Sequence, residues 1–536
     1  MATVRSAGIN VRIEKFFFTV AAGPDVSTAV RDTMALFNVE DAGIWPDGAG
    51  VAELSIGSLL VASSVSFENS TVRVKVTISF WRQELIPEVF FEDACRPLPP
   101  NAGKSGTEDA VGLIRRLVQL NIFKLMHKIT GINPGPWGIL RGVRPTKIIH
   151  RLLDQGLTRP EIIKKLLEDY ALETDKAQLV TDIAIHQRSI IANPDNPAVP
   201  GKISIYVGVP YCPSRCLYCS FPAYVLPERR EQLDAFLRAI KRDIESATQL
   251  IAKHNLLVES IYVGGGTPTS LAAADLATLL DLIRKGFFRS STKEFTVEAG
   301  RPDSINDEKI DVLRRYGVNR VSINPQTMQD KTLKQIGRRH TVQDIIDVFG
   351  KIRHSGIPII NMDVIAGLPG ETQADMEDTM RQIAAMNPEN ITVHTLALKR
   401  GSLLKASLLS GTIAGQVLPD EQTTQAMLRI AAAWVSKMDM HPYYLYRQKY
   451  MTGNLENIGY ARPDTDCLYN IQIMEERQTI IGIGPAAGTK AVNQSNWRLQ
   501  SCYNAKDVVS YIKNLDIYLN ERNALLSRLY GDHEED

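Results

Sequence analysis

Residues 203–221 read ISIYVGVPYCPSRCLYCSF and contain the two features from which the fold can be inferred. The first part, ISIYVGV at 203–209, is a β-branched apolar run of the kind that forms a buried strand. The second part places Cys212, Cys216 and Cys219 within eight residues, and these are three of the six cysteines in the chain. We therefore expect a strand that leads directly into a loop carrying three thiols.

Segments of strand type alternate with segments of helix type from residue 203 onward. The expected strands are 203–209, 259–263, 294–298, 319–323, 358–364 and 391–396. The expected helices lie near 229–253, 271–288, 306–316, 329–355, 371–386 and 421–438. Such alternation predicts an α/β fold with a parallel sheet, here a partial TIM-like barrel of six (βα) units. In such a barrel the active-site residues lie at the C-terminal ends of the strands.

The remaining parts of the chain differ in pattern. We expect a strand-rich N-terminal domain at 1–105, because NVRIEKFFFTV and TVRVKVTISFW alternate β-branched and aromatic residues. Residues 106–200 are predicted to be a helical segment followed by a proline-containing linker, which gives the barrel an N-terminal α+β extension. The core is then 201–440, and 441–536 is a mixed C-terminal region.

The composition limits the classes of function. The chain has 536 residues, 44% of them hydrophobic and 23% charged, which is ordinary for a globular protein. A formal net charge of +1 gives no support for a nucleic-acid or anionic-membrane partner. No stretch reaches the roughly 20 apolar residues of a membrane-spanning helix, and the N-terminus has no apolar run of signal-peptide type. We therefore expect a cytoplasmic protein without a membrane span.

Three thiols at the spacing CxxxCxxC admit two kinds of explanation. They could be buried thiols or half of a zinc site, but structural zinc takes four closed ligands and there is no second CxxC here. A [4Fe–4S] cluster in an ordinary electron carrier is also held by four thiolates. Three thiolates would leave one iron open to a ligand that is not part of the protein.

CxxxCxxC after the first strand of a six-unit partial barrel resembles the radical S-adenosylmethionine (SAM) enzymes. The resemblance implies that the open iron chelates the amino and carboxylate groups of SAM, which is cleaved to methionine and a 5′-deoxyadenosyl radical. The cofactors are then a [4Fe–4S] cluster, held by Cys212, Cys216 and Cys219, and SAM. GGGTPTS at 264–270 resembles the glycine loop of the coproporphyrinogen-oxidase-like branch, although alone it could be an ordinary turn.

The same resemblance implies a set of SAM-binding residues at or near successive strand ends. These are Tyr206, Tyr218, Gly265, Gly266, Thr267, Glu298, Gln326, Arg338, Asp363 and Ala397. Taken alone, Glu298 or Asp363 would be read as a helix cap or surface charge, and Arg338 as a solvated side chain. Their joint placement after the cysteine motif favours the functional reading. An arginine such as Arg338 can pair with a carboxylate through two hydrogen bonds.

PWGILRGVRPTKIIHRLL and YRQKYMTGNLENIGYA resemble the HemZ-type subgroup of that branch. The implied reaction is oxidative decarboxylation of two coproporphyrinogen III propionates to vinyls, giving protoporphyrinogen IX. It implies a porphyrinogen substrate, a one-electron donor such as flavodoxin or ferredoxin, and a terminal electron acceptor. Two positions depart from the oxidase pattern, because Phe221 stands where it has a fourth cysteine and Gly208 where it has a histidine.

Three other functions stay open at this point. Phe221 also matches relatives that resemble haem chaperones, so a haem-binding protein that keeps the cluster and SAM is the first. Radical chemistry on another substrate is the second, and a scaffold without catalysis is the third. If the substrate is a tetracarboxylate, the cations that could bind it are Arg141, Arg144, Lys147, Arg447 and Lys449. Surface charge is an equally good explanation of these five side chains.

Overall fold

The structure is a computed structural model, and it describes most of the chain. The described residues are 3–6, 9–19, 25–45, 54–68, 70–81, 88–98, 110–219, 223–398, 401–410, 417–448 and 451–531. They form two compact units. The first consists of Met1–Gly142 and Ile148–Thr181, and the second of Val143–Lys147 and Asp182–Asp536. Within the described residues, no helix is both long enough and apolar enough to cross a membrane.

The first unit is built on a five-stranded sheet with the order β4-β3-β5-β6-β7. Its strands are β3 (Lys15–Phe18), β4 (Glu40–Ile44), β5 (Ser58–Glu68), β6 (Thr71–Phe80) and β7 (Glu88–Pro97). A separate hairpin joins β1 (Thr3–Ser6) to β2 (Ile9–Arg12). The alternating pattern of β6 buries Val72, Val74, Val76 and Ile78 completely. This apolar face explains why the N-terminal region reads as strand-rich.

The buried face of that sheet is covered by α1 (Ser27–Met34) and α2 (Ala110–Thr130). α2 packs on β6 and β7, as the helical spacing of its apolar residues predicts. The other helices that begin in this part of the chain are α3 (Thr146–Asp154), α4 (Arg159–Tyr170) and α5 (Thr174–Gln187). β7 ends at Pro97, and residues 99–109 lie outside the described residues.

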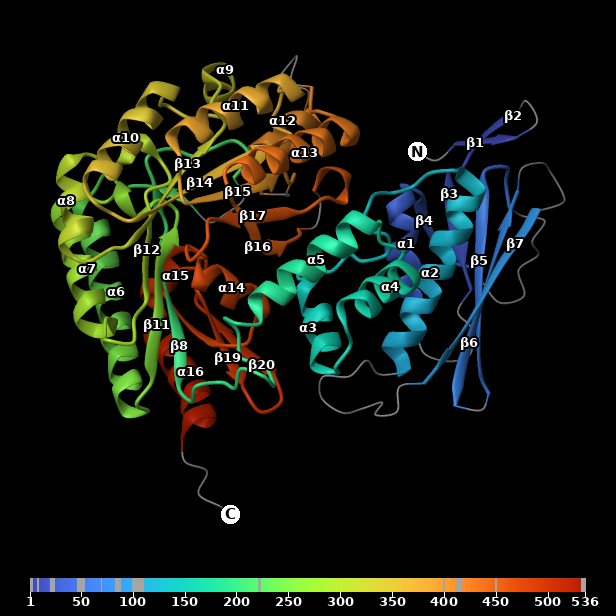
Figure 1. Ribbon diagram of the computed structural model, residues 1–536, viewed down its shortest axis with the longest axis horizontal. Coiled ribbons are helices and arrows are strands. Elements are labelled where there is room, and N and C mark those ends of the chain that lie inside the picture. The colour runs from blue at the N-terminus through green and yellow to red at the C-terminus, as the bar shows by residue number, and fades with distance from the viewer. Residues whose placement is uncertain are drawn as a thin grey trace. The chain divides into compact units, whose positions relative to one another are not determined.

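The second unit contains one sheet of eleven described strands. Its centre is the predicted parallel array in sequence order: β8 (Lys202–Val209), β11 (Leu257–Gly265), β12 (Glu294–Glu298), β13 (Arg320–Gln326), β14 (Ile359–Ala366) and β15 (Asn390–Thr395). Helices form the outer layer along these strands (Figure 1). The six-unit α/β prediction is confirmed.

Most predicted helices match the observed ones within two residues. The helices of this unit are α6 (Arg230–Lys253), α7 (Ala273–Phe287), α8 (Asp307–Arg315), α9 (Asp330–Gln335), α10 (Val342–His354), α11 (Gln373–Met386), α12 (Leu403–Ser410) and α13 (Glu421–Lys437). The single helix predicted at 329–355 is wrong, since the chain breaks into α9 and α10. Gly337 takes a φ of +82° there. Thr341 then caps α10 in a capping box with Asp344.

The C-terminal region extends the sheet on both sides. β16 (His441–Tyr446) and β17 (Asn457–Ala461) are added antiparallel beyond β15, while β18 (Thr479–Ile483) is added parallel to β8. β19 (Gly488–Asn493) and β20 (Arg498–Tyr503) follow as antiparallel strands. Three helices complete the region: α14 (Leu468–Glu475), α15 (Val508–Lys513) and α16 (Leu515–Tyr530). The region is mixed, as expected, but it shares the barrel's sheet, which no local pattern indicated.

Candidate active site

A cavity of about 410 Å³ lies where the parallel strands end. All thirteen residues singled out from the sequence line it: Tyr206, Cys212, Cys216, Tyr218, Cys219, Gly265, Gly266, Thr267, Glu298, Gln326, Arg338, Asp363 and Ala397. They come from five of the six parallel strands and from the segments that follow them. The structure therefore brings the predicted set together in one place, and their contacts with a cofactor stay a prediction.

The cysteine loop is held by backbone hydrogen bonds to other parts of the unit. The short strand β9 (Tyr211–Cys212) pairs in parallel with β10 (Tyr224–Val225). The Leu217 N–H donates to the Ile336 carbonyl at 3.0 Å, and the Leu217 carbonyl accepts from Leu404 N–H at 2.8 Å. The loop between the second and third cysteines is thus fixed by segments more than 100 residues away in sequence. Phe221 lies outside the described residues.

The thiols are largely shielded from solvent. Burial raises the pKa of the Cys212 thiol to about 11, and the Thr267 hydroxyl lies 3.4 Å from its sulfur. Cys216 is buried, and its sulfur accepts a hydrogen bond from Arg301 Nη1 at 3.3 Å. A metal ion would take the place of the thiol protons, because thiolates are the ligand form of cysteine. Without such an ion, burial keeps the Cys212 thiol protonated.

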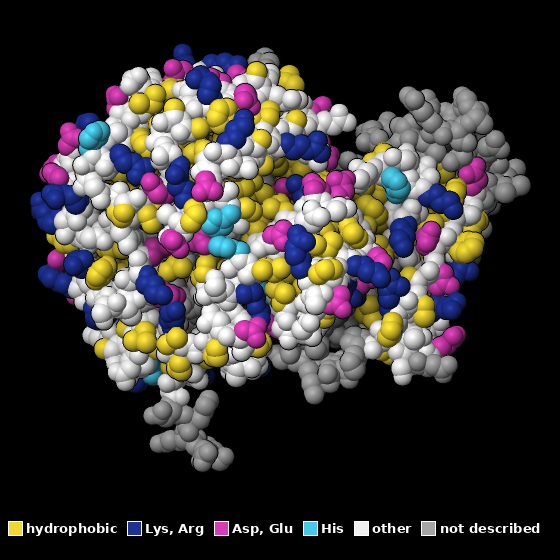
Figure 2. Space-filling model, in the orientation of Figure 1, with side chains coloured by type: hydrophobic (Ala, Val, Ile, Leu, Met, Phe, Trp, Pro, Cys, Tyr) yellow, Lys and Arg dark blue, Asp and Glu magenta, His cyan; other side chains and the backbone are white. Residues whose placement is uncertain are grey.

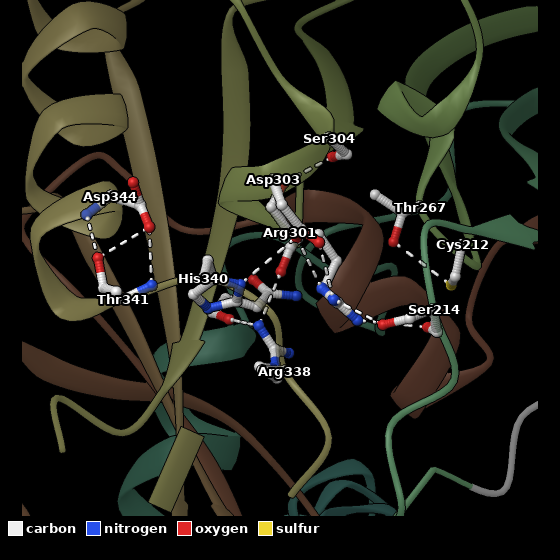
Figure 3. Close-up of polar contacts among 12 residues, drawn as sticks. Cys212, Ser214, Thr267, Arg301, Asp303, Ser304, Arg338, His340, Thr341 and Asp344 are labelled. Atoms are coloured by element: carbon white, nitrogen blue, oxygen red, sulfur yellow. Dashed lines mark hydrogen bonds and ion pairs between the residues drawn. The ribbon is translucent and has the colours of Figure 1, made fainter. Parts of the chain in front are cut away.

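Arg301 is a residue that the sequence analysis missed, although it stands in the motif TVEAGRP next to Glu298. Its guanidinium donates to both oxygens of Asp303 at 3.0 Å and to the Ser214 hydroxyl at 2.9 Å (Figure 3). His340 lies 3.4 Å from Asp303 on the other side. Burial alone would raise the pKa of Asp303, but the nearby His340 ring and the hydrogen bonds from Arg301 hold it well below the usual range. The ion pair fixes Arg301 against the cysteine loop.

The glycine loop needs glycine because the cysteine strand lies directly against it. Gly265 has a φ of +112°. A Cβ at Gly266 would lie 2.6 Å from the Tyr211 carbonyl oxygen, which is a clash with backbone. The close approach lets the Gly266 N–H donate to the Val209 carbonyl at 2.7 Å and the Thr267 N–H to the Tyr211 carbonyl at 2.7 Å. The loop thereby presents Thr267 to Cys212.

Arg338 and Gln326 lie on the next part of the cavity wall. Arg338 donates to the Asn324 carbonyl at 2.6 Å and to the Tyr218 hydroxyl at 3.1 Å, so it connects β13 with the cysteine loop. It comes from the break between α9 and α10. Gln326 ends β13 with a φ of +69°, a left-handed conformation that costs energy for a residue with a side chain. Its buried Oε1 has no partner within the described residues.

Glu298 ends β12 and faces a stack of tyrosines. Its Oε1 accepts from the Tyr262 hydroxyl at 2.7 Å. Burial raises the pKa of Glu298 to about 7, and the nearby Asp363 acts in the same direction. Tyr262 pairs with Tyr206 in the register of β11 and β8, and its ring stacks on Tyr469 at 4.5 Å. Tyr262 and Tyr469 were not predicted. Only the alternation of β11 could have placed Tyr262 beside Tyr206.

The sequence predicted that Asp363 would lie at the end of its strand. In the structure it lies three residues before the end of β14. Its Oδ1 accepts from Asn361 Nδ2 at 2.8 Å, and its Oδ2 lies 3.6 Å from His394 Nε2. Asn361 also donates to the Ser322 hydroxyl at 2.7 Å. Asp363 thus belongs to a polar belt that crosses β13, β14 and β15 inside the cavity. Ala397 pairs with Met451 just beyond β15.

The residues present fit the expected [4Fe–4S] cluster and SAM. The three thiols line one cavity, which is the donor set that iron–sulfur clusters use. An acidic group, a basic group and an unpartnered amide oxygen line the same cavity, at Glu298, Arg338 and Gln326. These groups are complementary to the ammonium and carboxylate of an amino acid. Cys212, Cys216 and Cys219 would hold the cluster, and the other ten predicted residues would surround SAM.

Four of the five cations suggested for a tetracarboxylate substrate are engaged elsewhere. Arg144 and Lys147 each contact Glu476 at 2.6 Å. Arg447 is buried and donates to the carbonyl groups of Asn454 and Leu455. In the first unit, Arg141 donates to the Asp32 carbonyl. Lys449 lies outside the described residues. Their charge had suggested a binding role, but paired charges in a folded chain serve equally well as internal contacts.

Comparison with known proteins agrees with this geometry. The family model described as the radical SAM superfamily matches residues 206–383. The oxygen-independent coproporphyrinogen-III oxidase-like protein HemZ of Bacillus subtilis is 38% identical over 424 residues, which cover 79% of this chain and 83% of that protein. The heme chaperone HemW of Bacillus subtilis is 29% identical over 54% of this chain and 73% of its own length.

Among solved structures, coproporphyrinogen III oxidase (HemN) of Escherichia coli aligns with 63% of this chain and 73% of its own, at 23% identity and a TM-score of 0.48. The match to HemZ extends over most of both chains, well beyond the segment that the superfamily model covers. This chain therefore belongs to the radical SAM superfamily and, within it, to the family of HemZ, the oxygen-independent coproporphyrinogen-III oxidase-like protein.

Proposed function

We propose that this protein decarboxylates two propionate side chains of coproporphyrinogen III oxidatively to vinyl groups, giving protoporphyrinogen IX. The observation that carries the proposal is the gathering of three thiols and ten expected SAM contacts in one cavity of a HemZ-family chain. The [4Fe–4S] cluster and SAM of the superfamily, when bound, supply a 5′-deoxyadenosyl radical that can abstract a propionate β-hydrogen. The protein's own residues bind, orient and shield the reactants.

The cysteine end of the cavity is suited to holding the cofactors. Arg301 fixes the loop through Ser214 and Cys216, and Arg338 ties Tyr218 to β13. These contacts hold the loop from Ser214 to Tyr218 against the barrel, so we expect little rearrangement of it when the cluster binds. Glu298 is the carboxylate best placed to accept from the ammonium of SAM. A cation at that position would favour the ionised form and lower the pKa of Glu298.

The opposite part of the lining is the proposed substrate side. It comes from β15, β16 and α14 and includes His394, Tyr446, Asn470 and Met474. The Tyr446 hydroxyl and His394 Nδ1 are 3.1 Å apart, and the other ring nitrogen of His394 faces Asp363 at 3.6 Å. This chain of groups could accept or return a proton at the substrate without involving the cluster. Tyr444 and Tyr446 add stacked aromatic surface, which suits a pyrrole ring.

A haem-binding function is the second candidate. Phe221 in the sequence and the similarity to the heme chaperone HemW favour it. The internal pairing of Arg144 and Lys147 with Glu476 also favours it, since those cations are then not available to four substrate carboxylates. Both candidates use the same cysteine site. They differ in whether the tetrapyrrole is converted or only held.

An anaerobic assay separates the two candidates. Reconstituted protein is mixed with SAM, a one-electron donor such as flavodoxin or ferredoxin, an electron acceptor and coproporphyrinogen III, and the products are identified by mass. Loss of two carboxyl groups that disappears in Cys216→Ala supports the decarboxylase. SAM cleavage with unchanged porphyrinogen, together with stoichiometric haem binding, supports the haem-binding protein. SAM cleavage with neither result points to another substrate.

We also propose a compartment for this reaction. None of the six cysteines, all of which are described, forms a disulfide bond. Thiols kept for a cluster require reducing conditions. We therefore place the proposed reaction in the cytoplasm.

A further inference from the structure

Two histidines and an aspartate from distant parts of the second unit meet outside the cavity. His186 lies at the end of α5, His441 begins β16, and Asp466 precedes α14. His186 Nε2 is 2.6 Å from Asp466 Oδ2, and His441 Nε2 is 3.2 Å from Asp466 Oδ1. The two Nε2 atoms are themselves 3.2 Å apart. None of the three residues lines the cysteine cavity within the described part of the chain.

Two of the three distances, both 3.2 Å, have the size expected for the edges of a metal coordination shell, while the 2.6 Å between His186 Nε2 and Asp466 Oδ2 is that of a hydrogen bond. Zinc bonds of about 2.0–2.1 Å place neighbouring ligand atoms of a tetrahedron about 3.3 Å apart. The three ligand atoms lie within 4.8 Å of one another. Hydrogen bonding alone accounts less well for the 3.2 Å between the two Nε2 atoms. If both imidazoles donate from Nε2 to the carboxylate, two N–H groups face each other, whereas a cation accepts both nitrogen lone pairs.

The scaffold around the three side chains is rigid. Gln187 Nε2, one residue after His186, donates to the Tyr443 carbonyl in β16 at 2.9 Å. His441 pairs with Ala461 in the sheet. The carbonyls of Thr465 and Asp466 accept from the buried Arg320 at 2.8 and 2.9 Å. Because the backbone on all three sides is fixed, the ligand atoms would need little rearrangement to bind an ion.

The site is also open to solvent. The side chains of His186 and His441 are 35% and 32% exposed, and that of Asp466 is 12% exposed. Figure 2 shows histidine side chains side by side, next to acidic ones, on the face where β16 and α14 lie in Figure 1. A metal ion can therefore enter from solution, and one or more coordination positions stay available to water.

We propose that His186, His441 and Asp466 bind a divalent transition-metal ion of the zinc type, independently of the cysteine site. Two imidazoles and one carboxylate suit zinc and its first-row neighbours. The ion joins segments that are 255 and 280 residues apart in sequence. β16 and α14 carry Tyr444, Tyr446, Asn470 and Met474 into the cavity, so the ion would stabilise the proposed substrate side.

The test uses the full chain with its cluster reconstituted anaerobically and with other metals removed by a chelator. Zinc is titrated by calorimetry, and bound zinc and iron are counted separately by mass spectrometry. We expect about one zinc per chain. His441→Ala and Asp466→Asn should each weaken zinc binding by roughly 100-fold, since the first removes one of three ligands and the second replaces a carboxylate by a neutral, weaker amide oxygen. The matched control is His354→Ala, because His354 is an exposed histidine whose ring hydrogen-bonds to the Gly350 carbonyl of its own helix.

Equal zinc binding by the parent and both variants, or no stoichiometric zinc in the parent, would overturn the proposal. Unchanged iron content in the variants shows that they are folded around the cluster. Cobalt titration of the parent gives a reading that does not depend on any variant. Cobalt at an imidazole and carboxylate site gives weak visible bands without the strong near-ultraviolet band of a cobalt–thiolate bond. A thiolate band would show that the ion binds at the cysteines, and it would contradict the proposed histidine–aspartate site.

Discussion

The cavity at the strand ends and the cluster around Glu476 both collect charged side chains from distant parts of one unit, yet they differ in what those charges face. In the cavity, Glu298 and Arg338 face a volume of about 410 Å³. In the cluster, the buried Glu476 carboxylate is contacted by Arg144 and Lys147 at 2.6 Å and by Lys490 at 2.9 Å. Burial would raise the pKa of Glu476, but these cations hold it below its usual value.

The difference shows how a charged motif should be judged. The sequence presents LRGVRPTK as a possible anion site and TVEAGRP as a strand end with one acidic group of interest. In the folded chain the first motif serves an internal contact and the second serves the cavity. Arg144 and Lys147 balance an internal carboxylate, while Arg301 holds the cysteine loop. A charge is available to a ligand only where the fold leaves it facing open volume.

The largest expected effect is the loss of activity when a cavity cysteine is replaced, compared with a cysteine elsewhere in the unit. Cys216→Ala removes a buried thiol that lines the cavity, so we expect loss of the [4Fe–4S] cluster and no detectable 5′-deoxyadenosine from SAM. Iron content, visible absorbance and product analysis measure this. Cys502→Ala is the control, because Cys502 lies on β20 and does not line the cavity. A Cys216→Ala protein that keeps four irons per chain would show that the cysteine set is misassigned.

A second effect compares two buried carboxyl groups. Burial raises the pKa values of Glu298 and Glu371 to about 7 in both cases. Glu298 lines the cavity, whereas Glu371 accepts from the Thr327 hydroxyl at 2.6 Å. Glu298→Gln should weaken SAM binding about tenfold or more, as expected for loss of a charged hydrogen bond. Equilibrium binding to the reconstituted protein measures this, and equal SAM affinity in Glu298→Gln and Glu371→Gln would remove the distinction.

The raised pKa values of Glu298 and Glu371 also lead us to expect that the free energy of unfolding depends on pH. Their pKa values are near 4.5 when unfolded and about 7 when folded, so the folded state binds more protons between these pH values. The contribution of these two groups to the free energy of unfolding of the cofactor-free chain should therefore fall as pH rises from about 4.5 to about 7. Each group contributes on the order of 2–3 kcal/mol. Denaturant unfolding at several pH values should give a shallower decline for Glu371→Gln, and an unchanged slope would contradict the assignment.

The smallest effect is expected in the Glu476 cluster. Arg144→Ala leaves Lys147 and Lys490 to balance the carboxylate, so stability should fall by only about 1 kcal/mol. Porphyrinogen affinity and turnover should stay within about twofold of the parent. A loss of affinity without loss of stability would return Arg144 to the list of substrate contacts. Glu476→Gln sharpens the measurement, since it leaves three neighbouring cations without their counter-charge and should destabilise the protein more.

Local pattern was sufficient for the barrel strands and most of its helices. The run ISIYVGV became β8 almost residue for residue, and α6, α7, α8, α11 and α13 begin and end within two residues of the expected bounds. These elements bury continuous apolar faces, and the spacing of apolar residues within each short segment predicts such a face. The break at Gly337 was also readable, because the glycine and the Thr341–Asp344 capping box are local signals.

Gly208 and Phe221 are the two positions that differ from the oxidase pattern, and the structure describes only the first of them. A Cβ at Gly208 would lie 3.1 Å from the Pro485 carbonyl oxygen, so the turn after β18 restricts larger residues there. The sequence could not indicate this contact, since 277 residues separate the two positions. Phe221 lies outside the described residues. The proposed assay, rather than the structure, tests whether a chain with Phe221 converts a tetrapyrrole or only binds it.

The sequence by itself determined the strand–helix order, the cysteine triad and the glycine loop, because each depends on residues close together in the chain. Only the tertiary structure decided that β16 and β17 extend one edge of the barrel sheet while β18 extends the other, and that Arg301 reaches Cys216. It also decided that Arg144 and Lys147 balance Glu476 and that His186 meets His441 and Asp466. These pairings join residues 25 to 332 positions apart, and side-chain charge alone does not specify its partner until packing brings the segments together.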